Sequence, residues 1–532
     1  MKRWHQTGLV IIALWLATSA PQISGWLNQS DAQRYLARIP SNPSDTAAYY
    51  SDIEQARQGR WLFANQLTSE PQRPSLFHPL WLVTGWLAAL GRLTTPVAFQ
   101  AVRLIALALF VIVLDSIISQ IFDRRQHQLI ALAIVATSSG LGWLVAAQTF
   151  NGRAILGAPI DLWVDEANTF RSFSHSALFI GSQLLLLLVL WATYWQSQGQ
   201  PVRHARWVGP WLALLGLIHP YDLVSAAAVS VVWLSVWVAA DAPDRNRLKT
   251  VFRVIAKWWL WVVPVAVYYL ALPWQQAAMR GWFLQNINPS PSVAALLMGF
   301  GLLLPLAAVG VATSWRARGR LTPFLVCWAV TVLVIIYAPQ LSIQRRLLSG
   351  VHIPLALLAA GGFMWLLERN IVSRLKPAVA LLGVAALAIT NLKLLQADVR
   401  DIRYPHGRDY PIYASRGTMR ALDWLRRNSS LDDVVLANFW DGNTIAGLAG
   451  RPVVFAHPNQ TVASWKREQD WETFIRSATA PDDRQAVVSR LGARWLYWTE
   501  SDTPGGYRPE QDSRWLMRYR DDGLAIYQLQ GR

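Results

Sequence analysis

Three acidic residues in one short polar segment could do chemistry. Asp161, Asp165 and Glu166 lie within the stretch from Pro159 to Phe170, between long apolar runs. Carboxylate oxygens at this spacing could ligate a hard divalent cation such as Mg²⁺ or Mn²⁺, or position a substrate hydroxyl. A solvated acidic loop beside an apolar segment has the same composition, so both interpretations stay open.

A pair of adjacent arginines, Arg345 and Arg346, forms the second group of interest. Two neighbouring guanidinium groups can hold a phosphate through charge-assisted hydrogen bonds. Their long side chains could instead reach membrane headgroups without binding a substrate. Arg103, just inside an apolar run, is a further candidate for phosphate binding.

His219 and Asp222 interrupt two apolar runs in the sequence His-Pro-Tyr-Asp. A proline and a charged residue at such a boundary are typical of a loop between two spans. The alternative is that one of them lines a substrate site, because an ionisable group beside apolar runs is costly unless it has a partner.

The elements that must position these residues are mostly apolar helices. The chain has 532 residues, of which 53% are hydrophobic and 15% charged. From Gly8 to about Leu395 the apolar residues form runs of roughly 15 to 25, enough to cross a bilayer. The formal net charge of +17 comes largely from short basic clusters between these runs, which is typical of a membrane protein and argues against nucleic-acid binding.

The basic clusters fit one orientation in the membrane, with about eleven full crossings. This orientation requires 79–90 to be an interfacial or re-entrant helix, and its least secure crossing is the short run 206–219. It places the N-terminus in the cytoplasm and the tail outside, as in a bacterial inner or plasma membrane. The predicted crossings are 7–27, 97–121, 128–148, 175–195, 206–219, 222–240, 258–273, 294–313, 323–339, 350–367 and 377–395.

The predicted domain organisation follows from this topology. Residues 1–396 form a transmembrane domain with outer loops at 28–96 and 149–174, residues 397–411 form a linker, and 412–532 form an exported α/β domain. In that domain the residue pattern predicts a helix and several short strands. The helix is expected at 415–427 and the strands at 433–437, 452–455, 495–498 and 524–528.

Asp45 lies in the first outer loop, after the turn-forming sequence Asn42-Pro-Ser. By spacing alone it could be the N-cap of a helix. The sequence also resembles the GT-C superfamily of membrane glycosyltransferases, which includes protein O-mannosyltransferases, aminoarabinose transferases and oligosaccharyltransferases. Asp45 matches, by position, the acidic residue that the family carries after its first span. His78-Pro79-Leu80 partly matches a second family motif, and the resemblance covers the membrane half and the exported tail.

The resemblance implies an inverting sugar transfer, from a polyprenyl-phosphate-linked donor to a glycan, lipid or protein acceptor at the outer face. Asp45 would then be the general base, and Asp165 and Glu166 would orient the acceptor or a cation. Arg345 and Arg346 would stabilise the departing phosphate. The remaining predicted binding residues are Arg103, His78, His219 and Asp222, and the candidate metal ligands are Asp45, Asp161 and Asp165.

Two alternatives from other functional classes remain. A transporter would explain Asp115, an acidic residue deep inside a predicted span. A non-catalytic scaffold or assembly subunit would use the exported domain for binding and would tolerate replacement of the loop acids. The sequence does not identify the sugar, the lipid or the acceptor.

Overall fold

The computed structural model describes residues 2–145, 157–202, 204–314, 320–405 and 410–530. It divides into two compact units. The first comprises Met1–Pro21, Ala101–Val267 and Ile287–Asp398, and the second comprises Gln22–Gln100, Tyr268–Asn286 and Val399–Arg532. The predicted crossing 128–148, outer loop 149–174 and linker 397–411 each extend partly outside the described residues.

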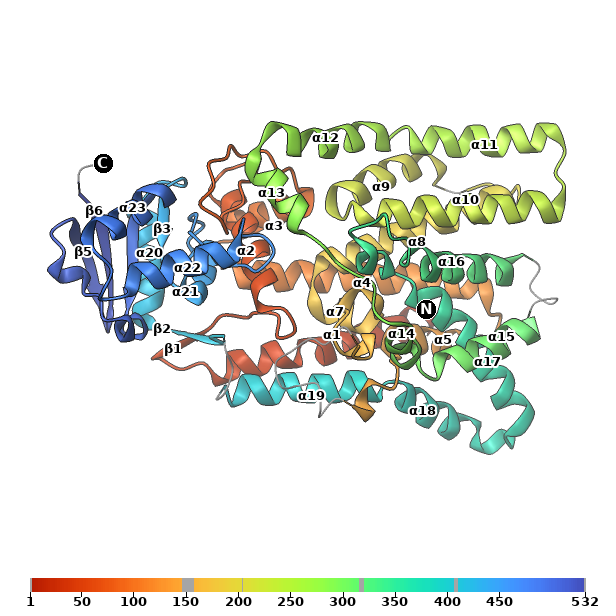
Figure 1. The fold of residues 1–532 in the computed structure, drawn as a ribbon. Helices are drawn as coiled ribbons and strands as arrows, with labels where there is room; N and C mark the ends of the chain where they lie inside the picture. Colours follow the sequence, from red (N-terminus) through yellow and green to blue (C-terminus); the bar gives the residue numbers. More distant parts are fainter. Residues whose placement is uncertain (1, 146–156, 203, 315–319, 406–409, 531–532) are drawn as a thin grey trace. The chain divides into compact units, whose positions relative to one another are not determined.

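The first unit is built from apolar helices (Figure 1). Among the described residues, five helices are long and apolar enough to cross a membrane, or up to eight spans form if each bent pair counts as one. The chain is thus an integral membrane protein, and its described residues offer fewer candidate spans than the eleven crossings predicted. The five helices are α1 (Lys2–Asn28), α4 (Thr95–Ile121), α8 (Ala177–Ser197), α10 (Tyr221–Asp241) and α17 (His352–Asn370).

Three further candidate spans are bent pairs of shorter helices, with bends of 41°, 74° and 58° in chain order. The sharpest bend occurs at Gly301, whose φ is +48° and where an added Cβ atom would lie 2.9 Å from Cγ of Leu141, so a side chain there would clash. The pairs are α11 (Arg245–Trp259) with α12 (Val262–Gln275), α14 (Val293–Phe300) with α15 (Leu303–Ser314), and α18 (Lys376–Leu387) with α19 (Ile389–Arg403).

Small residues allow α15 and α17 to pack closely. A Cβ atom added at Gly310 would lie 2.0 Å from the carbonyl oxygen of Leu358, and one at Gly362 would lie 2.0 Å from that of Leu306. Glycine is therefore required at both positions for the two backbones to meet. The other elements of this unit are α5 (Arg125–Thr137), α7 (Thr169–His175), α9 (Ala205–Ile218), α16 (Leu321–Ile335) and the 3₁₀ turns η2 (Ile160–Leu162), η3 (Asp165–Ala167) and η4 (Gln344–Leu348).

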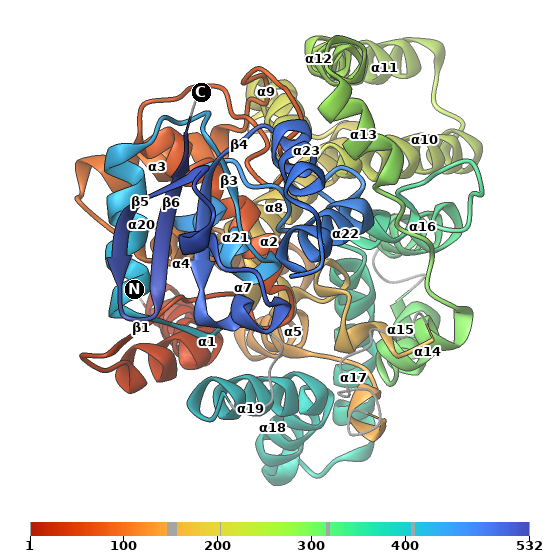
Figure 2. The same cartoon turned by 60° about the vertical axis from the view of Figure 1, so that its left-hand side comes forward.

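The second unit contains a four-stranded mixed sheet in the order β3-β4-β6-β5 (Figures 1 and 2). Strand β3 runs parallel to β4, whereas β6 is antiparallel to both β4 and β5. The strands are β3 (Val434–Leu436), β4 (Ala493–Thr499), β5 (Trp515–Asp521) and β6 (Leu524–Leu529). The predicted strands at 433–437, 495–498 and 524–528 are confirmed, whereas β5 was not predicted and 452–455 contributes only isolated bridges, from Val453 to Val435 and from Phe455 to Thr68.

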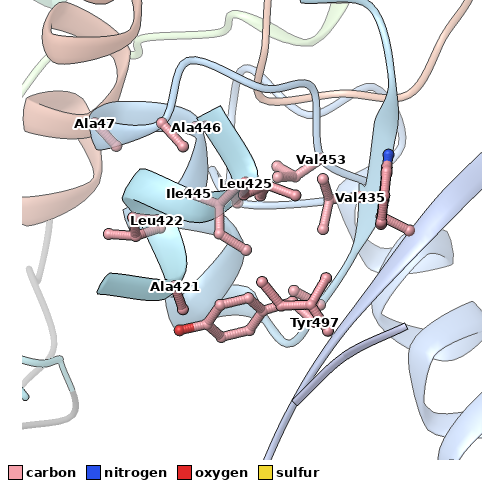
Figure 3. Packing of buried hydrophobic residues seen from close by; sticks show 14 of the residues in the cluster. Ala47, Ala421, Leu422, Leu425, Val435, Ile445, Ala446, Val453 and Tyr497 are labelled. Carbon is pink, nitrogen blue, oxygen red and sulfur yellow. The ribbon is translucent and has the colours of Figure 1, made fainter. Parts of the chain in front are cut away.

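Helices cover both faces of this sheet. On one face, Tyr497 and Val435 pack against residues of α20 and α21 (Figure 3). On the other face, Leu496 and Trp498 pack against α22 and α23. The alternation of buried side chains along β4 is thus that of a strand between two layers. The helices are α20 (Arg416–Asn428), α21 (Phe439–Leu448), α22 (Ser464–Ile475) and α23 (Pro481–Leu491), and α20 confirms the helix predicted at 415–427.

The first predicted outer loop is part of this unit. Its helix α2 (Pro43–Arg57) contributes Ala47 and Ala48 to the same core as α20 and α21 (Figure 3). Strand β1 (Gln33–Tyr35) also pairs in antiparallel register with β2 (Tyr413–Ser415). Residues from both ends of the chain therefore build one folded body. Helices α3 (Pro79–Leu90) and α13 (Ala277–Gln285) complete the unit.

Candidate active site

The acidic segment of the first unit is buried and paired with basic residues. Asp165, in η3, is 5% exposed, and its Oδ1 accepts a hydrogen bond of 2.7 Å from Nε of Arg171. The other carboxylate oxygen lies 3.7 Å from Nε2 of His175, and Arg171 also lies 3.8 Å from Asp398. Burial alone would lower the pKa of Arg171, but the Asp165 and Asp398 carboxylates outweigh it and raise that pKa.

Glu166 and the arginine pair come together because η3 contacts η4. Oε1 of Glu166 lies 3.4 Å from Nη1 of Arg346. Arg345 donates through Nη2 to Oδ1 of Asn288 at 2.9 Å, and its guanidinium lies 5.0 Å from the ring centre of Trp163. The predicted residues Asp165, Glu166, Arg345 and Arg346 thus form one cluster. Within it Arg346 pairs with a carboxylate, whereas Arg345 contacts an amide and an aromatic ring.

His219 and Asp222 support η4 from α10. Nδ1 of His219 lies 3.0 Å from Oδ1 of Asp222, and the other carboxylate oxygen accepts a 3.2 Å hydrogen bond from the hydroxyl of Ser349, which directly follows η4. Asp222 is fully buried. These contacts fix the segment that carries the arginine pair, so the prediction that either residue touches substrate stays a prediction.

Asp161 organises the backbone near the same cluster. Its Oδ2 accepts hydrogen bonds from the amides of Gly140 and Gly142, at 3.0 and 3.2 Å. Burial raises the pKa of Asp161 to about 6, although these hydrogen bonds act in the opposite direction. No group of three or more His, Cys, Asp or Glu side chains in the described ranges could hold a metal ion. Cation binding by Asp45, Asp161 and Asp165 therefore stays a prediction.

Arg103 is fully buried in α4. Its guanidinium donates to the hydroxyls of Thr18 and Ser19, at 3.1 and 2.8 Å, and to the carbonyl oxygen of Phe173 at 2.7 Å. These bonds join α1, α4 and α7. They are the contacts of a residue that holds three segments together, and phosphate binding by Arg103 stays a prediction.

Asp45 lies in the second unit and is not the N-cap of its helix. The cap is Asn42, whose side-chain oxygen accepts from the amide of Asp45, because Pro43 begins the helix. The cap interpretation of Asp45 is thus wrong. The carboxylate instead accepts hydrogen bonds from Nδ2 of Asn42 at 2.5 Å and from Nε2 of His457 at 2.7 Å.

His457, in the loop after residue 455, was not predicted as a site residue. Its Nδ1 accepts hydrogen bonds from the backbone amides of Asn459 and Gln460, both at 3.0 Å. Two donors at Nδ1 leave the proton on Nε2, so the imidazole is neutral and donates to Asp45. The contact spans 412 residues in sequence, and no local pattern indicates it.

His78, the other predicted residue of the first loop, begins α3. Its ring stacks on Trp81, with 5.4 Å between the centroids and 15° between the planes. Trp81 in turn contacts Tyr49 of α2 and Phe99. The sequence His78-Pro79-Leu80, which partly matches a family motif, therefore begins in an aromatic cluster that packs α3 against α2.

Two further acidic positions of this unit also escaped prediction. Asp52, on α2 and two helical turns beyond Asp45, has its pKa raised by burial. Asp441 begins α21 and has its pKa raised to about 6 by burial and by the nearby Asp502. Asn438 donates to both Asp441 and Asp502, at 2.6 and 2.9 Å. Burial thus shifts the titration of Asp52 and Asp441 toward higher pH.

Comparison with known proteins identifies the fold. Neither a protein-family model nor a curated protein sequence matches this chain. The apo oligosaccharyltransferase of Archaeoglobus fulgidus superimposes with a TM-score of 0.56 and 14% identity, over 93% of this chain and 69% of that one. The same enzyme with an inhibitory peptide and a dolichol phosphate gives 0.53 and 15%, with the same coverage. ArnT from Cupriavidus metallidurans bound to undecaprenyl phosphate gives 0.43 and 12%, over 98% of both chains. The resemblance predicted from the sequence is thus confirmed at the level of the fold, which this chain shares with an oligosaccharyltransferase, one of the enzymes that the resemblance names.

Proposed function

We propose that this chain is a membrane glycosyltransferase that moves a sugar from a polyprenyl-phosphate-linked donor to an acceptor hydroxyl or amide at the outer face of the membrane. The observation that carries the proposal is the cluster of Glu166 with the arginine pair Arg345 and Arg346, within a fold shared with an oligosaccharyltransferase. An arginine pair beside a carboxylate suits a phosphate that gains charge as it leaves.

In the proposed reaction the acceptor oxygen or nitrogen attacks the anomeric carbon of the sugar from the side opposite the phosphate. The bond from that carbon to the phosphate oxygen breaks, and the configuration inverts. Asp45 takes the acceptor proton, a role that its ionised carboxylate can fill while neutral donors hold it in place. Arg345 and Arg346 stabilise the polyprenyl phosphate that departs, and Asp165 and Glu166 orient the acceptor.

The contacts of Asp115 weaken the transporter alternative. Its carboxylate pairs with Arg3 at 3.2 Å and with Arg125 at 2.5 Å, and it accepts a hydrogen bond from Thr7 at 3.0 Å. An acidic residue in α4 that is neutralised in this way has a structural reason to be there. No transport step is needed to explain it.

The proposal is tested with the full chain in vesicles that contain radiolabelled polyprenyl-phosphate sugars and candidate acceptors. We expect Asp45→Asn to lower transfer by about 100-fold or more, since it keeps the shape but loses the base. Arg346→Ala should raise the donor KM by about tenfold, from the loss of a charged hydrogen bond. Arg369→Ala, which removes a cation from the far end of α17, is the matched control and should leave the KM unchanged. A normal rate of transfer in Asp45→Asn would contradict the proposal that Asp45 is the general base.

A further inference from the structure

A cavity of about 520 Å³ lies between α4, α8 and α9 in the first unit. This volume falls within the roughly 300 to 1,000 Å³ of sites that hold small molecules. Its walls include Trp191 and Trp195 of α8 and Trp211 of α9. Trp195 lies near the end of α8, some 27 Å along the helix axis from the end that follows His175. The cavity is therefore separate from the acidic cluster.

The flank of α4 that leads to this cavity is apolar and exposed. Ile105, Leu109 and Ile112 are 55%, 51% and 37% exposed and lie on one stripe of the helix, which continues to Ser116 in the cavity lining. Because α4 and α8 are both candidate membrane spans, such a stripe faces hydrocarbon. An apolar chain could thus enter the cavity along α4 without crossing water.

Polar side chains occupy the exposed part of the lining. Gln120, Gln200 and His204 can each donate a hydrogen bond, and all three are exposed. Amide and imidazole donors at the opening of an apolar cavity fit a ligand with a polar head and an apolar chain.

On the side formed by α8 and α9, the charge around this opening is positive. Arg206 begins α9 two residues after His204, and Arg247 donates to the carbonyl oxygen of Ser197 at the end of α8, at 2.9 Å. The stretch 196–210 contains no acidic residue. Basic side chains at this position attract a negatively charged headgroup.

We propose that this cavity binds a lipid with a phosphate headgroup, whose chain lies among Trp191, Trp195 and Trp211 and whose phosphate meets Gln120, Gln200 and His204. A membrane phospholipid and a polyprenyl phosphate share this chemistry, and the experiment below separates them. The proposal does not depend on the transferase activity, because binding is measured without transfer.

The test is native mass spectrometry of the full chain in detergent micelles, titrated separately with phosphatidylglycerol, a polyprenyl phosphate and diacylglycerol. Ser116→Trp fills the cavity from an exposed position, and Leu109→Trp places the same indole side chain on the same stripe of α4 two turns away. We expect Ser116→Trp to weaken lipid binding about tenfold, the factor that two displaced methylenes already cost, while Leu109→Trp binds as the wild type does.

The lipid that binds identifies the source of the ligand. Saturable binding of phosphatidylglycerol supports a membrane phospholipid, and binding of polyprenyl phosphate alone supports the carrier lipid. A second variant, Gln120→Leu/His204→Leu, should lose the preference for phosphate lipids over diacylglycerol. The proposal is overturned if Ser116→Trp and Leu109→Trp retain lipid equally. It is also overturned if the wild-type chain binds diacylglycerol as tightly as it binds the phosphate lipids.

Discussion

The two regions that carry the candidate catalytic acids hold them in different ways. Asp165 and Glu166, in the first unit, face the cationic side chains of Arg171 and Arg346. Asp45, in the second unit, receives its hydrogen bonds from Asn42 and from a neutral His457. The first region thus holds its carboxylates in ion pairs with arginine, whereas the hydrogen bonds from Asn42 and His457 to Asp45 come from an amide and an imidazole. The proposed roles, positioning for the first region and proton transfer for the second, are the hypothesis that the following experiments test.

The largest expected effect comes from breaking the charge pairing of the first region. Asp165→Asn leaves Arg171 buried with only the more distant Asp398, so we expect a loss of about 3 to 5 kcal/mol in unfolding free energy. Thermal unfolding in detergent measures it. Asp45→Asn makes the same substitution at the acid held by Asn42 and His457 and serves as the control. Similar losses in both variants would contradict the distinction between the two regions.

Removing the neutral donor from Asp45 should affect transfer more than stability. His457→Ala is expected to lower kcat by about 10- to 100-fold, the cost of one hydrogen bond to a charged group. The acid limb of the pH–rate profile should move to higher pH, because the carboxylate loses a donor that favours its ionised form. His457→Gln, which can still donate, should restore part of the rate. If the alanine variant keeps its pH profile, His457 has only a structural role.

Asp441 extends the comparison, since it too is held by neutral donors. Its pKa of about 6 lies above that of an unfolded chain, so the folded state binds more protons between about pH 4 and 6. Stability from this group is therefore complete at low pH and falls as the pH rises through 6. Asp441→Asn should raise the Tm by about 3 °C at pH 8 and leave it unchanged at pH 4. A gain of equal size at both pH values would exclude titration as the cause.

The smallest effect is expected at the helix cap that adjoins Asp45. Asn42→Ala removes the side-chain oxygen that caps α2 and should lower the unfolding free energy by about 1 kcal/mol. Asn42→Ser keeps a capping oxygen but loses the donor to Asp45. In differential scanning calorimetry the serine variant should therefore unfold near the wild-type temperature. If both variants unfold alike, the cap contributes nothing measurable.

Hydropathy predicted the long helices and the type of the tail domain, because both depend on local pattern. It predicted more crossings than the described residues offer as candidate spans, since the apolar runs at 206–219 and 323–339 form only the short helices α9 and α16. Strand β5 was missed because it lies at the sheet edge, with most of its side chains exposed and with Arg518 and Arg520 among them.

In the candidate site, the contacts that could be predicted were those between residues close in sequence or assigned to the same face. Glu166 and Arg346 could be expected to meet once both were assigned to loops on the same face, and Arg171 follows Asp165 by only six residues. The partnership of Asp45 with His457 could not be expected, because it depends on how the tail folds around α2. Local patterns thus identified the charged candidate residues but not His457, the partner of Asp45.

The participation of α2 in the core of the C-terminal unit has a consequence for synthesis. Arg38, just before α2, donates to Thr444 of α21 across 406 residues. At about 5 to 20 residues per second, roughly 20 to 80 s pass between the synthesis of these partners. During that time the core that α2 shares with α20 and α21 is not yet formed. The face of α2 left exposed carries the small residues Ala47 and Ala48, so little apolar surface meets water. The order of translation therefore makes completion of this unit one of the last events in the maturation of the chain.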